Sequence, residues 1–250
     1  MALCEFFVNY HKNQGIIRQK GYKIYSMGGC CYMNYNHLSS IYTDEFQFSR
    51  EKMQFFFDTA FKDADAGLLR SQYKALRELE FKTDFDFVTE TVDVSTLCEN
   101  LTSAFDVFAS TSGVNFIYCG NTTSAIMGNT RVLAKAFLNL LSNAFLHGNS
   151  KLVTIKTLEI DQHIQIEVQS GGIFPFNNAF GKGLSFVQRT CNYLNGQFLI
   201  ESRKESSKAI MCFKKSEIQK PYTDTKYDFQ NLLSDRLSPV YVEIFGMCYH

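Results

Sequence analysis

The sequence predicts an α+β fold: a helical hairpin followed by an α/β sandwich, in which a mixed sheet is covered by helices on one face. Two observations carry this prediction. Apolar residues recur at three- and four-residue spacing over about 36–81, which is typical of amphipathic helices. From about residue 94 onward, helical segments are interspersed with segments in which apolar and polar residues alternate, the pattern of half-buried strands. This order predicts helices layered on one sheet.

The hairpin is predicted from two helical segments joined by a short break. The first covers about 36–62, the break "KDADAG" covers 62–67, and the second helix covers 68–81. A helix pair with so short a connection is expected to be antiparallel. Residues 82–91 have the composition of a polar connection.

The sandwich is predicted from local patterns and helix-end signals. Asp93 or Ser95 can cap its first helix, Asn129 or Thr130 can start the next long helix, and Asp161 begins a turn between two strands. The expected elements are a helix ending near Ala109, a strand in 114–120, a helix over 130–147, strands over 152–158 and 163–168, a helix over 184–194, and strands over 196–203 and 207–214.

These elements divide the chain into four parts. Residues 1–35 stay unassigned, 36–91 form the hairpin, 92–215 form the sandwich, and 216–250 form a tail. The tail has its own apolar patch, "SPVYVEIFGM", and one expectation is that it packs on the sandwich.

The bulk composition excludes several classes of protein. The 250 residues suit one large or two small domains, and 45% of them are hydrophobic, which is ample for a core. Lys and Arg together number 25, as do Asp and Glu, so no strongly basic surface for nucleic acid is expected. No apolar run reaches membrane-spanning length, and the first residues lack the apolar region of a signal peptide. The eight Cys are scattered without a C-x-x-C pair, so buried free thiols in a reducing cytoplasm are expected.

Two asparagines stand out in the apolar segment "FLNLLSNAFLHGNS" at 137–150. Asn139 and Asn143 are four positions apart and therefore share one helix face. A buried amide without partners costs about 1–3 kcal/mol, so each must either bond to nearby backbone or face a polar cleft. Both explanations stay open from the sequence, and in a cleft the amide oxygens could coordinate a cation.

A glycine-bearing segment follows after the two strands. In "GKGLSFV", Gly181 and Gly183 stand at the start of the expected helix over 184–194. Glycines there allow the backbone to approach a phosphate closely, and the N–H groups of the helix start point toward it. The motif gains specificity from its order and distance relative to the asparagine pair.

Together these motifs resemble the ATP-binding catalytic domain of sensor histidine kinases, which has the Bergerat-type fold. "FLNLLSNAFLHG" resembles the N box of that family, while "SGGI" and "GKGLSFV" resemble its two Gly boxes, and the resemblance covers about 92–214. It implies that Asn143 holds Mg²⁺ on the phosphates of ATP. The residues that it implies for cofactor binding are Asn139, Asn143, His147, Ser170, Gly172, Gly181, Lys182, Gly183 and Leu184.

The sequence also departs from the family pattern. Ser170 or Gln169 stands where the family has an Asp that reads the adenine amino group, and His147 stands near the usual basic position. Only 173–180 remain where the family has a mobile lid, and Ser185 replaces the third Gly of the second box. These departures favour weakened nucleotide binding.

The family resemblance also implies a phospho-acceptor. Its catalytic domain follows a dimerising hairpin whose first helix carries a His, and His37 opens the corresponding segment here. A free imidazole nitrogen at this place can attack a γ-phosphate. The local sequence "NHLSSIYTDEF" lacks the family's acidic neighbour and Pro, so a partly exposed histidine at a helix start is the alternative.

The sequence therefore predicts the cytoplasmic part of a sensor histidine kinase. It would form a homodimer, bind ATP and Mg²⁺, autophosphorylate on His37 and pass the phosphoryl group to a response regulator, without nucleic acid and without a membrane segment in this chain. The alternative is a degenerate scaffold or phosphotransfer protein with weak or no ATP binding. A stand-alone kinase that phosphorylates a partner Ser is a third hypothesis, against which the hairpin argues.

Overall fold

The computed structural model describes residues 71–78, 89–120, 124–171, 181–203, 206–217 and 224–249, and the backbone of two strands near the N-terminus. The chain divides into two compact units, 1–47 and 48–250. In the first unit, β1 (Tyr25–Met27) and β2 (Cys30–Tyr32) pair in antiparallel fashion. The sequence left this segment unassigned.

The second unit is built on a five-stranded mixed sheet. Its strands lie in the order β4-β6-β7-β9-β8, with β4 parallel to β6 and every other neighbouring pair antiparallel. The bounds of the strands are β4 Asn115–Tyr118, β6 Leu152–Ile160, β7 His163–Gly171, β8 Gln197–Ser202 and β9 Ser206–Lys214. The predicted mixed sheet is confirmed, and its expected strands all form.

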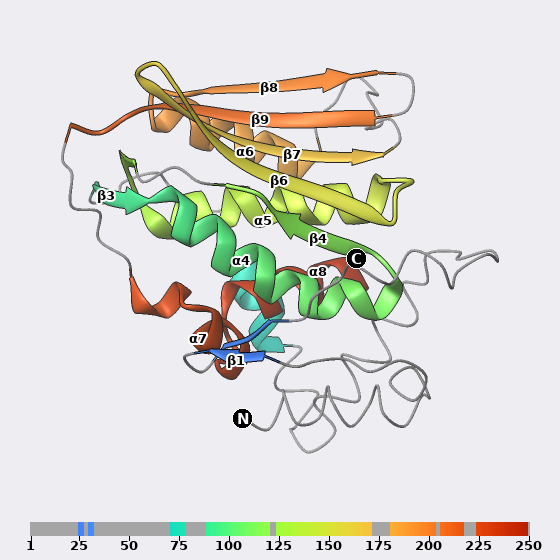
Figure 1. Ribbon diagram of the computed structural model, residues 1–250. Coiled ribbons are helices and arrows are strands. Elements are labelled where there is room, and N and C mark those ends of the chain that lie inside the picture. Colours follow the sequence, from blue (N-terminus) through green and yellow to red (C-terminus); the bar gives the residue numbers. More distant parts are fainter. Residues whose placement is uncertain are drawn as a thin grey trace. The chain divides into compact units, whose positions relative to one another are not determined.

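Three helices cover one face of this sheet, as Figure 1 shows: α4 (Val94–Ala109), α5 (Thr130–His147) and α6 (Lys182–Tyr193). Alternation along the strands sends Ile155 and Ile166 into the core beneath them. On strand positions of the other face, Ile117 and Leu199 are exposed. This arrangement confirms the predicted α+β class with helices on one face.

The ends of the helices follow from local sequence. The Asp93 side chain accepts hydrogen bonds from the Thr96 backbone N–H at 3.0 Å and from the Thr96 hydroxyl at 2.8 Å, so Asp93 and not Ser95 caps α4. Asn129 caps α5 by accepting from the Val132 N–H at 3.2 Å. The turn between β6 and β7 places Asp161 at φ 54°, which Asp tolerates.

A second, two-stranded sheet was not expected from the sequence. β3 (Glu90–Asp93) pairs in antiparallel fashion with β5 (Ala125–Gly128), so the predicted polar connection over 82–91 is wrong at its end. Neither "ETVD" nor "AIMG" alternates apolar and polar residues, so neither displays the pattern of a half-buried strand. Glu90 also joins β3 to α5, because its carboxylate accepts from the Thr130 N–H at 3.0 Å and from the Thr130 hydroxyl.

The expected helical hairpin is described only in part. Residues 71–78 are helical, which confirms the second helix within the described residues. The first helix, expected over 36–62, lies outside them. Tyr73 is fully buried, its hydroxyl donates to the Arg236 carbonyl at 2.5 Å, and its ring centroid lies 5.2 Å from that of Phe245. Helix 71–78 is therefore docked on the C-terminal tail.

The tail is ordered and packs on the helical layer, as expected. It contains η2 (Thr225–Tyr227), α7 (Phe229–Ser234) and α8 (Pro239–Tyr249). Tyr241 is fully buried, with its ring centroid 5.2 Å from that of Phe108 on α4. Apart from this anchor, α8 buries several apolar side chains, namely Val240, Val242, Ile244, Phe245 and Met247.

The five cysteines whose side chains the structure describes form no disulfide, as the sequence indicated, but they are not all buried. Cys98, Cys191 and Cys248 are buried, Cys212 is partly exposed and Cys119 is exposed. Burial, and then the nearby Cys212, raises the pKa of the Cys191 thiol to about 12. None of the helices that the structure describes is both long and apolar enough to cross a membrane.

A half-buried carboxylate between α4 and β4 predicts a pH-dependent stability. Asp106 accepts a hydrogen bond from the Phe116 N–H at 2.6 Å, and burial raises its pKa from 3.8 to about 6 although that bond acts in the opposite direction. The carboxylate therefore costs stability once the pH rises through about 6, and the cost vanishes below the unfolded pKa near 4. We expect Asp106→Asn to gain about 2 kcal/mol over the wild type at pH 7.5 and nothing at pH 3.5.

Urea unfolding of both proteins across this pH range measures the difference directly. Asp106→Ala, which lacks the acceptor for Phe116, is the control and should lose stability at both pH values. A difference between Asp106→Asn and wild type that is independent of pH would contradict the assignment.

Candidate functional site

One cavity lined by described residues has a volume of about 460 Å³. It lies between α5, the start of α6, the tail helix α8 and helix 71–78. Its lining residues are Asn139, Ser142, Asn143 and Leu146 from α5, Lys182 and Gly183 from α6, Glu243, Gly246 and Met247 from α8, and Lys74, Arg77 and Glu78 from helix 71–78. Four residues that the sequence predicted for a site, on two separate helices, therefore meet in one cavity.

The two asparagine side chains are held by the backbone of their own helix. Asn139 is buried, and its Nδ2 donates to the Lys135 carbonyl at 2.8 Å. Asn143 Nδ2 donates to the Asn139 carbonyl at 2.7 Å. Both explanations offered by the sequence thus hold together, since each amide bonds to backbone and also faces a polar cavity. With Nδ2 engaged, Oδ1 is the atom of each amide that can accept from a ligand or coordinate a cation.

The start of α6 comes into direct contact with this amide pair at Gly183. A Cβ atom added to Gly183 would lie 2.7 Å from Asn139 Oδ1 and 3.7 Å from Asn143 Nδ2. Only glycine allows this approach without a shift of the Asn139 side chain. The first N–H groups of α6, at Lys182, Gly183 and Leu184, therefore lie beside the amides, and such N–H groups have no partners within their own helix.

The charge at this place is more positive than negative. Lys74, Arg77 and Lys182 supply cationic groups, whereas Glu78 and Glu243 supply carboxylates. Glu243 is already paired with Lys135, whose Nζ lies 2.8 Å from Glu243 Oε2. Cationic side chains, a helix start and amide oxygens in one cavity suit an anionic group together with a divalent cation.

The remaining predicted residues lie elsewhere. His147 is exposed at the end of α5, and Ser170 is buried on β7 next to Gly148; neither lines the cavity. Gly181 caps α6 and is exposed, with no atom within 4 Å of an added Cβ, and Leu184 is half-buried. Gly172 and His37 lie outside the described residues.

Sequence reasoning missed the polar partners that surround Asn139. Lys135, Asn139 and Ser142 lie on one face of α5, and Glu243 of α8 binds both Lys135 and the hydroxyl of Ser142. Burial alone would raise the pKa of Glu243, but the Lys135 and Arg77 charges and the two hydrogen bonds outweigh it and lower that pKa. The spacing on α5 was the available signal, but nothing local points to a carboxylate more than a hundred residues away in the chain.

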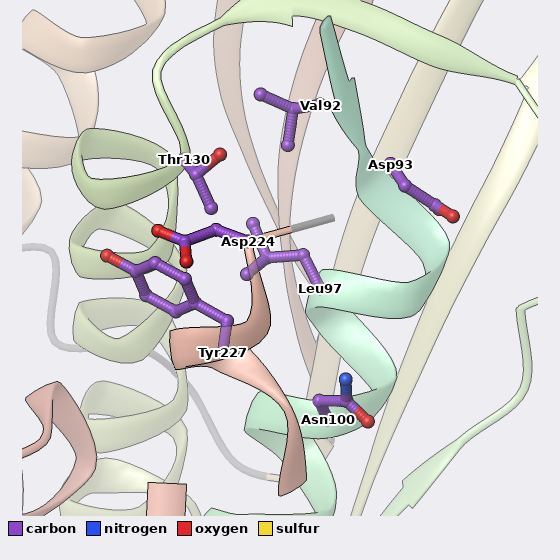
Figure 2. Close-up of a pocket in the computed structure, with 7 residues that line it drawn as sticks. All are labelled: Val92, Asp93, Leu97, Asn100, Thr130, Asp224 and Tyr227. Atoms are coloured by element: carbon purple, nitrogen blue, oxygen red, sulfur yellow. The ribbon is translucent and has the colours of Figure 1, made fainter. Parts of the chain in front are cut away.

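A second cavity, shown in Figure 2, has room for about one water molecule, with a volume of about 10 Å³. It lies between α4, the start of α5 and η2, where Leu97 and Tyr227 face each other across it. It offers no space for a substrate, in contrast to the cavity of about 460 Å³.

Comparison with known proteins matches neither a family model nor a curated protein. Among solved structures, full-length ShkA in complex with AMPPNP is similar over 67% of this chain and 40% of that chain, with 16% identity and a TM-score of 0.50. Histidine kinase AdeS of Acinetobacter baumannii covers 84% of this chain and 96% of its own, with 14% identity and a TM-score of 0.49. The catalytic domain of histidine kinase ThkA covers 52% of this chain and 98% of its own, with 15% identity and a TM-score of 0.47.

At these identities the likeness concerns the fold. The described part of the chain has the α+β fold of a histidine kinase transmitter-type domain. The resemblance first seen in the asparagine and glycine motifs is thus supported by the arrangement of strands and helices.

The contact between α6 and Asn139 predicts different outcomes for two neighbouring glycines. Helix propensity favours Ala at 183 by up to about 1 kcal/mol, but its Cβ would displace the buried Asn139 amide. We expect Gly183→Ala to lose about 1–2 kcal/mol of unfolding free energy overall. Gly181→Ala is the matched control and should change it by less than about 1 kcal/mol.

Thermal and urea unfolding of both variants test this expectation. A Gly183→Ala protein at least as stable as the wild type would show that α6 does not press against Asn139.

Proposed function

We propose that this protein is the cytoplasmic part of a sensor histidine kinase: it binds Mg-ATP, autophosphorylates on His37 within a homodimer and donates the phosphoryl group to a response regulator. The observation that carries the proposal is the contact between Gly183 and the amide pair of α5 inside a cavity with excess positive charge. The fold alone is compatible with many functions, whereas this contact joins the residues that phosphate binding requires.

The groups in the cavity fit a magnesium–phosphate ligand. Asn143 is partly exposed to the cavity, and its Oδ1 would hold Mg²⁺, which prefers oxygen ligands and retains several waters. Mg²⁺ would supply charge neutralisation on the phosphates. Asn139 lines the same cavity beside the start of α6. The N–H groups at the start of α6 donate to phosphate oxygens, and Lys182 adds positive charge.

The adenine end is assigned to the region between the end of α5 and the end of β7. Ser170 is buried beside Gly148 there, and His147 is exposed nearby on the last turn of α5. Ser170 can exchange a hydrogen bond with the adenine, and Gly172 belongs to the same assignment. A neutral hydroxyl gives a weaker contact than the carboxylate that histidine kinases usually have at this position.

The phosphotransfer step is assigned to His37 in the hairpin over 36–91. A ring nitrogen of His37 forms a bond to the γ-phosphorus, the bond from that phosphorus to the β–γ bridging oxygen breaks, and ADP leaves. The support for His37 comes from its position in the sequence before the catalytic domain.

The competing function is a phosphotransfer or docking scaffold that binds ATP weakly or not at all. The neutral, deeply buried Ser170 favours it, because it supplies no charge for the adenine amino group. The two functions differ in one measurable property, the affinity for Mg-ATP.

Loss of the Asn143 amide should weaken nucleotide binding in a magnesium-dependent way. We expect Asn143→Ala to bind a fluorescent ATP analogue at least about tenfold more weakly than the wild type with Mg²⁺ present, and with a smaller difference in EDTA. Loss of its hydrogen bond to the Asn139 carbonyl should cost only about 1 kcal/mol of stability.

Asn192→Ala is the matched control, because Asn192 is an exposed amide on α6 that bonds to Gln188 away from the cavity. It should bind the analogue like the wild type. Absence of wild-type binding at millimolar nucleotide would reject the kinase function and leave the scaffold.

Phosphorylation should depend on one histidine. After incubation with radiolabelled ATP and Mg²⁺, we expect acid-labile, base-stable label on the wild type and only background label on His37→Gln, because glutamine cannot accept the phosphoryl group.

His163→Gln changes an exposed histidine at the start of β7 and serves as the control, with labelling like the wild type. Undiminished label on His37→Gln would place the acceptor at another residue.

A further inference from the structure

We propose that Glu243, on the C-terminal helix α8, is a positioning residue for the asparagine pair of α5, and that α8 is therefore a working part of the candidate site. This inference deepens the proposed function, on which its nucleotide-binding consequence rests. The sequence treats the tail as separate from the catalytic domain. In the structure, Glu243 is the only buried carboxylate among the described residues of the tail, and it lies against the helix that carries both asparagines.

Glu243 binds α5 at two points. Its two carboxylate oxygens take different partners on α5: Oε2 pairs with Lys135 Nζ at 2.8 Å, and Oε1 accepts from the Ser142 hydroxyl. Lys135 stands one turn before Asn139 and Ser142 about one turn after it, on the same face. Glu243 therefore holds α5 on both sides of Asn139.

Lys135, one of the two residues that Glu243 binds, also orients the side chain of Asn139. The carbonyl of Lys135 is the acceptor for Asn139 Nδ2 at 2.8 Å, so the turn whose side chain Glu243 binds also orients the amide. At the start of α6, a Cβ added to Gly183 would lie 2.7 Å from Asn139 Oδ1. The amide nitrogen of Asn139 is thus held by the backbone of α5, and its oxygen lies beside the start of α6.

Burial removes Lys135 and Glu243 from contact with water. Lys135 and Glu243 are 4% and 2% exposed, so neither charge can be satisfied by bulk water. A buried pair of this kind contributes little net stability compared with apolar side chains of similar volume, and its best-attested use is to fix one arrangement. Here the arrangement that it fixes is the register of α8 on the Asn-bearing face of α5.

Helix 71–78 contacts α8 from another side. A Cβ added to Gly246 would coincide with the Arg77 guanidinium, so that group lies directly on the backbone of α8. Gly246 stands about one turn after Glu243, and the charge of Arg77 acts on the Glu243 carboxylate. α8 thus contacts both helix 71–78 and α5, the helix that carries the amides.

The test separates positioning from simple stabilisation by replacing the whole pair. Glu243→Gln alone leaves the Lys135 charge buried and risks unfolding, whereas Lys135→Met/Glu243→Met replaces both charges by apolar groups and should stay folded. Thermal unfolding and circular dichroism verify that it does. The full 250-residue chain is used throughout.

The first readout needs no ligand. In ¹⁵N-labelled protein, the side-chain amide resonances of Asn139 and Asn143 are assigned by single substitutions, and their exchange with water is measured. We expect exchange at Asn139 to be about tenfold faster in the folded double variant, because the turn that orients it is released. The Gln188 side-chain amide, which bonds to Asn192 on α6, is the internal reference and should not change.

The second readout is the affinity for a fluorescent ATP analogue with Mg²⁺, which should fall about tenfold in the folded double variant. Unchanged Asn139 exchange in that variant would overturn the positioning role whether or not nucleotide binds. If the wild type binds no nucleotide, the proposed function fails, while the exchange measurement still decides the role of Glu243.

Discussion

The burial of α5 on nearly all sides is the constraint on which the rest of the structure depends. Of its 18 residues, 14 are buried, including the polar residues Lys135, Asn139 and Ser142. A sheet face, α4, α6 and α8 together enclose it. A helix surrounded in this way must satisfy every polar side chain with protein partners, because water is excluded.

The polar side chains of α5 are satisfied in two ways. The two asparagines donate to carbonyls one turn earlier in the same helix, which requires no other element. Lys135 and Ser142 take a carboxylate from the far end of the chain. The first solution fixes the side-chain amides locally, and the second fixes which helix lies against them. As a result, a helix that is otherwise apolar contributes polar side chains to one side of the cavity.

The two ends of the proposed nucleotide site differ in how tightly their residues are packed and in the charge that they supply. The proposed phosphate end depends on the approach of Gly183 to Asn139, which a single added carbon would disturb. The proposed adenine end depends on the neutral Ser170, which is buried near the end of β7. A site of this kind recognises the charged part of its ligand more specifically than the base, because charge-assisted contacts are stronger than neutral ones.

The tail changes how the chain is divided into functional parts. α8 touches both the helix that precedes the sandwich and the helix that carries the asparagines, so helix 71–78 and α5 share a common neighbour. Packing elements that share a neighbour cannot shift independently in a dense core. The order of segments along the chain therefore differs from their order in space.

Much of the fold was determined by the sequence itself. The strands β6 and β7, their turn at Asp161 and the helical nature of 137–147 follow from neighbouring residues, because periodicity and turn conformation are local. Capping is local as well, and it narrowed the two helix starts to Asp93 or Ser95 and to Asn129 or Thr130, between which the structure chose Asp93 and Asn129. The asparagine pair and the glycines at 181 and 183 were recognised for the same reason, since their spacing is written in short segments.

The tertiary structure alone decided the rest. The short strands β3 and β5 form only because each supplies the hydrogen-bonding partner of the other, and neither carries a readable pattern. The cavity is bordered by α5, α6, α8 and helix 71–78, and the charge that binds Lys135 comes from Glu243, far along the chain. Neighbouring residues in the sequence determine whether a segment forms a helix, a strand or a turn. Burial and the pairing of buried charges determine which other elements it packs against.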